Sequence, residues 1–229
     1  NPIAMNNPVI IALDVESAVE ARVLVNALGD AAPFYKVGLE LYAAAGMEYV
    51  RELLGGGKKV FLDLKLYDIG ETVKRAVAQV ATAGVQFLTV HGSKAVMQAA
   101  VAGKQGAPLD LLAVTVLTSF DETDLRDLGY PCAVSDLVQL RVRKAVEAGI
   151  DGIVCSPLEV AGVRATAGPG MKLVTPGVRS AGSAKGDQKR VATPSEALRN
   201  GADYLVIGRQ VTRAADPRGE LQKILAEIG

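Results

Sequence analysis

Phe61-Leu62-Asp63-Leu64-Lys65-Leu66-Tyr67-Asp68 is an apolar strand that ends in charged residues. Because side chains alternate along a strand, Asp63 and Lys65 are expected on the same side. Asp68 follows within one loop, and a second amine, Lys36, lies near the end of the preceding apolar run. If the two strands are neighbours, lysine and aspartate side chains alternate at one edge of a sheet. Such a set can carry out proton chemistry on an anion.

Short β-branched runs alternate with longer, Ala-rich amphipathic segments along the whole chain, which is typical of repeated βα units. Eight strands are expected, at Val9–Leu13, Phe34–Val37, Lys59–Leu64, Gln86–Val90, Leu111–Leu117, Gly152–Val154, Lys172–Thr175 and Tyr204–Ile207. Helices are expected at Ala18–Leu28, Leu39–Leu53, Thr72–Ala83, Lys94–Ala102, Ser135–Ala148, Leu158–Ala165, Ser195–Asn200 and Pro217–Ile228.

Eight βα units in 229 residues predict one α/β domain, a closed parallel (β/α)8 TIM barrel with outer helices. An open doubly wound sheet would usually have fewer strands and an early glycine-rich dinucleotide turn, and no such turn follows Leu13-Asp14. The domain is expected to span residues 1–229. Residues 1–7 are expected to be a disordered end or an expression remnant.

The composition narrows the classes of partner. With 25 basic and 25 acidic residues, the chain gives no reason to expect nucleic acid as a ligand. Its apolar runs are shorter than the roughly 20 residues of a membrane-spanning helix, and no secretory segment is recognisable. The two cysteines, Cys132 and Cys155, are too few for a disulfide framework. We therefore expect a cytoplasmic protein with no membrane partner.

Polar residues follow the apolar runs, where a parallel barrel has its active site. The candidates are Asp14, Lys36, Asp63, Lys65, His91, Thr118, Ser119, Ser156, Pro176 and Arg209. Any one of them could be a solvated loop residue, but the whole set is expected to converge on one mouth.

The segments after the last two strands, Val174–Arg179 and Val206–Arg209, each combine glycine with arginine. In barrels these loops commonly bind phosphate, through backbone N–H groups and bidentate arginine contacts. Arg179 and Arg209 are therefore phosphate candidates. The polar segment 180–191 is expected to be a flap that closes on the phosphate, or else a plain surface loop. Gln188 is the residue within it best suited to reach phosphate and base together.

The residues favour no metal or cofactor. His91 is the only histidine, and a hydrogen-bonded polar residue at a strand end is the expected interpretation rather than a general base. Without a second histidine or a Cys/His cluster a zinc site is not expected, and no GxSxG motif indicates a serine nucleophile. Carboxylates could hold Mg²⁺, but Lys36 and Lys65 would repel it.

Beyond these patterns, the chain closely resembles the orotidine 5′-monophosphate decarboxylase family, bacterial type, from about Val9 to the last helix. The matching pieces are Ala12-Leu13-Asp14, Tyr35-Lys36-Val37-Gly38, Phe61–Ile69 with Thr72, Leu117-Thr118-Ser119, Thr175–Arg179, Asp187–Arg190 and Ile207-Gly208-Arg209. One departure is Gln210, where proline often follows the last arginine. The alternative is a Mg²⁺-dependent sugar-phosphate lyase or decarboxylase of the same superfamily. Those enzymes carry a metal-binding acidic residue near the position of Lys36, so Lys36 and Gln188 favour the first family. A non-catalytic phosphate-ligand sensor is a further alternative, which the intact charged set disfavours.

The resemblance implies a homodimeric, cofactor-independent enzyme that converts orotidine 5′-monophosphate to uridine 5′-monophosphate and CO₂, the final step of de novo pyrimidine synthesis. By this analogy Lys65 protonates C6, Asp63 lies against the substrate carboxylate, and Lys36 orients Asp63. The resemblance also implies that Asp68 and Thr72 reach into the neighbouring subunit's site. It further implies that the remaining contacts divide by part of the substrate: Asp14 and Lys36 for ribose, Thr118 and Ser119 for the pyrimidine, and Pro176, Arg179, Gln188, Gly208 and Arg209 for the phosphate end.

Overall fold

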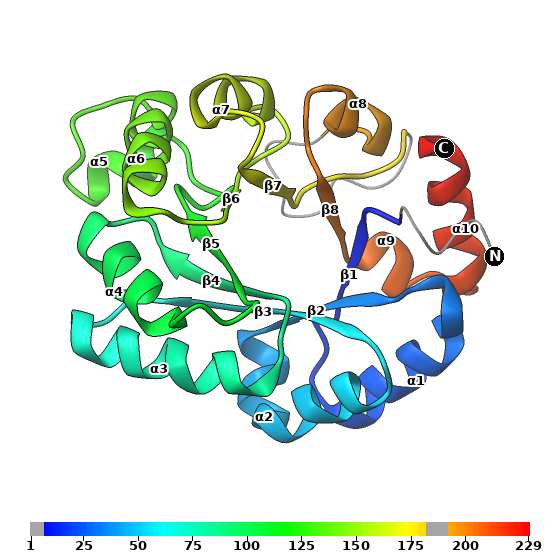
Figure 1. Ribbon diagram of the computed structural model, residues 1–229. Coiled ribbons are helices and arrows are strands. Elements are labelled where there is room, and N and C mark those ends of the chain that lie inside the picture. Colours follow the sequence, from blue (N-terminus) through cyan, green and yellow to red (C-terminus); the bar gives the residue numbers. More distant parts are fainter. Residues whose placement is uncertain (1–6, 182–191) are drawn as a thin grey trace.

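Eight parallel strands close into a barrel in residues 7–181 and 192–229, the part of the chain that the computed structural model describes (Figure 1). Each strand pairs with its sequence neighbours, and β8 pairs with β1. The strands are β1 Val9–Ala12, β2 Phe34–Gly38, β3 Lys59–Leu66, β4 Phe87–His91, β5 Asp110–Val114, β6 Gly152–Val154, β7 Lys172–Thr175 and β8 Tyr204–Ile207. The predicted TIM barrel is confirmed.

Helices surround the barrel and cover the outer face of its strands (Figure 1). They are α1 Ala18–Leu28, α2 Leu39–Gly55, α3 Gly70–Ala83, α4 Lys94–Lys104, α5 Glu122–Asp127, α6 Val134–Ala148, α7 Val160–Ala167, α8 Pro194–Arg199, α9 Arg209–Thr212 and α10 Pro217–Ile228, with a short 3-10 turn, η2 Gly29–Ala31. Most of the predicted helices are present with ends shifted by a few residues.

One predicted strand end was wrong, and two helices were missed. The fifth strand ends at Val114 instead of Leu117, because Val114 is the last of its residues to pair with either neighbour, opposite His91 of β4 and Val154 of β6. Helices α5 and α9 were not predicted at all. Helix α5 begins with a capping box, in which the Asp121 carboxylate accepts from the backbone N–H groups of Thr123 and Asp124. That cap satisfies N–H groups that the first turn of a helix leaves without partners, so a helix of only six residues can form.

The barrel interior is a small apolar cluster below the mouth. It comprises Ile10, Ala12, Phe34, Phe61, Phe87, Leu112, Val174 and Val206. The ring centroids of Phe34 and Phe87 lie 5.1 Å apart, and those of Phe61 and Phe87 lie 5.9 Å apart. These rings fill the lower barrel. The next inward-pointing residues, two positions closer to the carboxyl end of each strand, therefore form the floor of the mouth.

Close packing of α3 on α4 fixes the helix that follows β3. A Cβ atom at Gly103 would collide with the backbone carbonyl of Lys74, so only glycine allows this approach. At the opposite end of the barrel, the side chain of Asn7 donates to the carbonyl of Ala31 and accepts from the N–H of Val9. Asn7 is therefore tied into the fold, whereas residues 1–6 of the N-terminal stretch lie outside the described part.

Candidate active site

A pocket opens at the carboxyl ends of the strands, with a cavity volume of about 250 Å³. This volume is slightly below the roughly 300–1,000 Å³ of typical small-ligand sites. Its lining residues are Ala12, Asp14, Lys36, Asp63, Lys65, Val114, Val116, Leu117, Thr118, Val154, Pro176, Gly177, Val178, Arg179, Val206, Ile207, Gly208, Arg209 and Gln210. Residues far apart in the sequence, from the first strand to the last, thus meet at one mouth.

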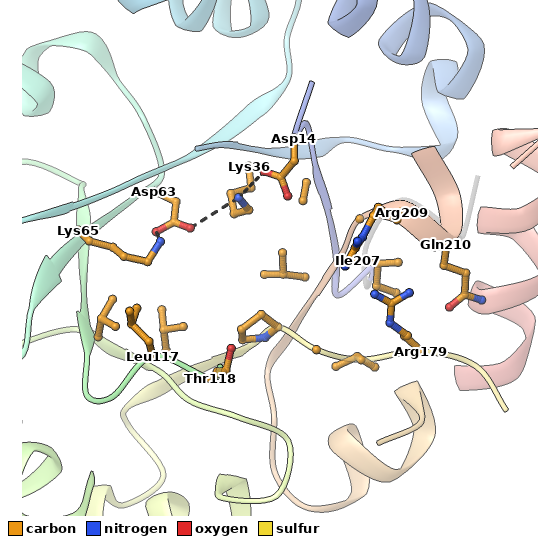
Figure 2. Close-up of a pocket in the computed structure, with 18 of the residues that line it drawn as sticks. Asp14, Lys36, Asp63, Lys65, Leu117, Thr118, Arg179, Ile207, Arg209 and Gln210 are labelled. Carbon is orange, nitrogen blue, oxygen red and sulfur yellow. Dashed lines mark hydrogen bonds and ion pairs between the residues drawn. The ribbon is translucent and has the colours of Figure 1, made fainter. Parts of the chain in front are cut away.

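Four charged side chains form a row along one wall of this pocket (Figure 2). Lys65 Nζ lies 2.9 Å from Asp63 Oδ1, and Asp63 Oδ2 lies 3.6 Å from Lys36 Nζ. Lys36 Nζ in turn donates to Asp14 Oδ1 at 2.9 Å. The exposed fractions of the Lys36 and Asp63 side chains are 12% and 13%, whereas that of Lys65 is 37%. The row therefore has a buried centre and a more accessible ammonium at one end.

Glycine at position 38 makes room for the centre of the row. Gly38 pairs with Asp63 across β2 and β3, one inward position beyond Lys36. A Cβ atom there would lie 3.0 Å from Lys36 Nζ and 3.4 Å from Asp14 Oδ1. The absence of a side chain thus lets the lysine extend along β2 to both carboxylates.

The end of β3 departs from the regular strand that the sequence predicted. Leu62 pairs with Leu88 and Leu66 with Val90, so three residues of β3 stand opposite the single residue Thr89 of β4. Lys65 has φ 49°, in the left-handed region that non-glycine residues rarely adopt. Asp63 and Lys65 do meet, as the alternation suggested, but through a β-bulge and not through an extended strand.

Opposite charges determine the protonation of the two buried members of the row. Burial by itself would raise the pKa of Asp63, but the ammonium groups of Lys36 and Lys65 outweigh it and hold that pKa below its ordinary value. Burial would likewise lower the pKa of Lys36, but the carboxylates of Asp63 and Asp14 raise it above its ordinary value. Near neutral pH both groups are charged.

The arginine end of the pocket lies away from Lys65. Figure 2 shows Arg179 and Arg209 beyond Asp14, with Gln210 beside them. Gln210 Oε1 accepts from the backbone N–H of Ser180, and its Nε2 donates to Glu220 Oε1 at 3.0 Å. The Gln210 side chain therefore joins the segment that follows Arg179 to helix α10.

The structure brings only some of the other predicted residues to the pocket. Thr118, Pro176 and Gly208 line the pocket, whereas Ser119 is exposed and is not among the described lining residues. Asp68 and Thr72 are exposed at the start of α3 and do not line the described part of the pocket either. Gln188 and most of segment 180–191 lie outside the described residues.

His91 is the last residue of β4, the strand that pairs with the bulged end of β3. Its ring stacks on Tyr67 with centroids 4.1 Å apart, and its Nδ1 is buried without a hydrogen-bond partner in the described residues. Burial and the nearby Arg141 guanidinium lower its pKa below the ordinary value, so the ring is neutral at pH 7. The hydrogen bond expected for His91 is thus missing at Nδ1 in the described residues, and its ring packs against Tyr67 instead.

Three contributors to the site were missed by sequence reasoning. Gly38 provides space, Thr89 binds both Asp63 and the Lys65 backbone, and Gln210 braces the arginine end. Only Thr89 had a visible signal, a hydroxyl at the inward position two residues after Phe87 in an otherwise apolar strand.

Within residues 7–181 and 192–229, His, Cys, Asp and Glu side chains form no group of three or more that could hold a metal ion. No helix there has the length and apolar character needed to cross a bilayer.

A closed (β/α)8 barrel with a lysine–aspartate row at one end of its mouth and two arginines at the other defines a TIM-barrel protein built for a small anionic ligand. The chain belongs to the orotidine 5′-phosphate decarboxylase / HUMPS family, whose model matches residues 7–224.

Individual relatives agree with this assignment. An orotidine 5′-phosphate decarboxylase of Rhodopseudomonas palustris is 51% identical over 228 residues, which cover 100% of this chain and 97% of the relative. One from Afipia carboxidovorans is 53% identical over 219 residues, covering 96% of this chain and 93% of the relative. The crystal structure of orotidine 5′-phosphate decarboxylase from Lactobacillus acidophilus aligns with a TM-score of 0.86 at 34% identity, covering 98% of this chain and 100% of that one.

Proposed function

We propose that this protein decarboxylates orotidine 5′-monophosphate to uridine 5′-monophosphate, the final step of de novo pyrimidine synthesis. The observation that carries the proposal is the row Lys36–Asp63–Lys65, which places an accessible ammonium beside a buried carboxylate at one end of the pocket. Relatives with more than half of their residues identical and nearly equal length carry the name of this activity.

The chemistry requires a cation at the reacting carbon. When the bond between C6 and the carboxylate breaks, CO₂ leaves and the electron pair stays on C6 as a localised carbanion. A fixed ammonium stabilises such charge better than water does, because it needs no reorganisation during the reaction. Lys65 then gives one proton to C6, becomes a neutral amine, and regains a proton from solvent.

Asp63 and Lys36 prepare Lys65 for that role. The Asp63 carboxylate holds the Lys65 ammonium at 2.9 Å, and Lys36 balances the charge of Asp63 from the other side. Asp63 would also repel the substrate carboxylate, a charge that disappears on decarboxylation, although this ground-state effect has the smaller share.

The arginine end supplies binding energy remote from the chemistry. Arg179 and Arg209 suit a phosphate monoester through charge-assisted hydrogen bonds. Asp14 and Lys36 suit ribose hydroxyls between the two ends. Thr118, which lines the pocket, and the exposed Ser119 beside it are proposed for the pyrimidine. Binding energy from the phosphate aligns the reacting end of the substrate. No cofactor or metal is needed for this scheme.

We further propose that two copies of the chain form the working enzyme. Residues 67–72 are all exposed, and within them the side chains of Tyr67 and Ile69 are 70% and 73% exposed. Two large apolar side chains beside the mouth suit burial against a second subunit. Asp68 and Thr72 belong to this exposed stretch, so contact with a partner's site is their proposed role. A cytoplasmic location is also proposed and is favoured by the free cysteines Cys132 and Cys155.

The test of the activity is loss of orotidylate, followed by ultraviolet absorbance with EDTA present. Wild-type protein should consume the substrate, and Lys65→Ala should lose at least the ~10²–10⁴ factor usual for a proton donor while still binding uridylate. The exposed Lys59 begins the same strand at the end opposite the mouth and does not line the pocket, so the matched control Lys59→Ala should keep full activity. Turnover of Lys65→Ala near the wild-type rate would remove Lys65 from this role. Activity on a sugar phosphate only after Mg²⁺ is restored would identify the metal-dependent alternative instead.

The test of the dimer mixes two inactive variants. Lys65→Ala and Asp68→Ala subunits, unfolded together and refolded, should regain activity in the heterodimers, since one of their two sites is intact. A mixture as inactive as its components would show that Asp68 does not act across subunits.

A further inference from the structure

We infer that Thr89 is a positioning residue, whose buried hydroxyl fixes both the backbone of Lys65 and the carboxylate of Asp63 in the geometry that the reaction needs. The expected effect of Thr89 on turnover rests on the proposed function, whereas its hydrogen bonds to Lys65 and Asp63 do not.

The Thr89 hydroxyl closes a ring of hydrogen bonds. Thr89 Oγ1 accepts from the backbone N–H of Lys65 at 2.9 Å and donates to Asp63 Oδ1 at 2.8 Å. The same Asp63 oxygen accepts from Lys65 Nζ at 2.9 Å. One oxygen of Asp63 thus receives a neutral and a charged donor, and one hydroxyl holds both ends of the lysine–aspartate pair.

The position of Thr89 opposite the β-bulge explains why a hydroxyl is needed there. Three residues of β3, 63–65, face this single residue of β4, so the regular ladder between the two strands is interrupted. An N–H group left without a ladder partner in a bulge needs another acceptor when it is buried. Thr89 Oγ1 is that acceptor for Lys65, and the left-handed φ of 49° at Lys65 occurs at this contact.

Burial makes the hydrogen bonds of Thr89 sensitive to substitution, because water cannot replace a lost hydroxyl there. Thr89 is 0% exposed, and Phe87, two residues before it on β4, belongs to the apolar cluster inside the barrel. Without the hydroxyl, the Lys65 N–H would face an apolar methyl group, and the Asp63 oxygen would lose its neutral donor. The ammonium of Lys65 could then still pair with Asp63, but no side chain of β4 would set the direction of either group.

The variant Thr89→Val keeps the shape of the side chain and removes only the hydroxyl. Loss of a hydrogen bond to a charged group predicts a decrease in kcat of about tenfold or more. KM for orotidylate should stay within about threefold of wild type, because the arginine end of the pocket is untouched. Thr89→Ser, which keeps the hydroxyl, should restore kcat to within about threefold.

Thr115→Val is the matched control. Thr115 is also a fully buried threonine of the barrel, but its Oγ1 has no hydrogen-bond partner in the described residues. The same chemical change should therefore leave kcat within about twofold of wild type. If Thr89→Val does not fold, Thr89→Ala takes its place, since it removes the hydroxyl without adding volume.

A second readout does not depend on activity. Hydrogen exchange of the Lys65 backbone amide, followed by NMR, should be at least about tenfold faster in Thr89→Val and unchanged in Thr89→Ser. Equal exchange rates in all three proteins, or a kcat for Thr89→Val equal to that of wild type, would overturn the inference. A serine variant as impaired as the valine variant would do so as well, because it would assign the effect to the methyl group. If wild-type protein does not consume orotidylate, the proposed function fails, while the exchange rates still decide the role of Thr89.

Discussion

Replacing Gly38 by alanine should displace the Lys36 ammonium and leave the barrel folded. The new Cβ would lie 3.0 Å from Lys36 Nζ and 3.4 Å from Asp14 Oδ1. Gly38 has φ −97°, which any residue adopts, so alanine brings no backbone strain. The collision involves the end of a flexible side chain, so the lysine moves and the strand does not. Alanine also restricts the unfolded chain, which offsets part of the cost by about 0.4–1 kcal/mol.

The loss of activity follows from the contacts of Lys36. Its Nζ has little freedom, with Asp14 at 2.9 Å and Asp63 at 3.6 Å. Moving it away from the new methyl group lengthens at least one of these contacts. A hydrogen bond to a charged group is worth about 1.5–3 kcal/mol, and about 1.4 kcal/mol corresponds to a factor of ten. The expected decrease in kcat/KM is therefore roughly 10- to 150-fold.

The assay combines kcat/KM for orotidylate with the melting temperature. Gly55→Ala is the control, because nothing lies within 4 Å of a Cβ at that glycine. Both variants should melt close to wild type, and only Gly38→Ala should lose activity. Gly38→Ala activity within about twofold of wild type would refute the reasoning, since it would mean that the position of the Lys36 ammonium is not critical.

Three further predictions concern other parts of the protein. Arg209→Ala should raise KM by roughly 10- to 150-fold, because it removes a charged phosphate contact. Arg213→Ala, at an exposed position outside the pocket lining, should leave KM unchanged. An equal KM in the two variants would mean that Arg209 does not bind the phosphate. Because the folded pKa of Asp63 is depressed, its stabilising contribution is present above the unfolded pKa of about 3.9 and is lost as pH falls through the folded value. The difference in unfolding free energy between wild type and Asp63→Asn should therefore shrink on acidification from pH ~5, and a constant difference would contradict it. Gly103→Ala should lower stability by about 1–3 kcal/mol in urea unfolding, because its Cβ meets the Lys74 carbonyl and pushes α4 away from α3. An unchanged unfolding midpoint would show that the two helices can separate at little cost.

The barrel could be predicted because its signal repeats. Each strand is a short β-branched run and each helix a longer amphipathic one, so an error in one unit does not alter the fold class. Short elements without such a pattern were missed. Helix α9 has four residues, and α5 depends on a cap at Asp121 that lies in a polar, loop-like stretch.

The site was predictable as a set of residues but not as a geometry. Lys36, Asp63 and Lys65 are visible in the sequence because charges at strand ends stand out against apolar runs. The bulge in β3 has the same alternation as a regular strand, so its register shift against β4 has no sequence signal of its own. The space at Gly38 depends on the path of the Lys36 side chain, which only the three-dimensional structure reveals.

The bridge made by Gln210 connects the pocket to the C-terminal helix. Ser180, whose backbone Gln210 holds, also donates its hydroxyl to Glu227 of α10 at 2.7 Å. Helix α10 thus braces the arginine end, whereas the lysine–aspartate row rests on β1 to β3 at the other end of the mouth. The two ends of the pocket are consequently supported by different parts of the chain. A tag fused after Gly229 that shifts α10 would therefore reach the arginine end first, and the lysine–aspartate row only through the substrate that the two ends share.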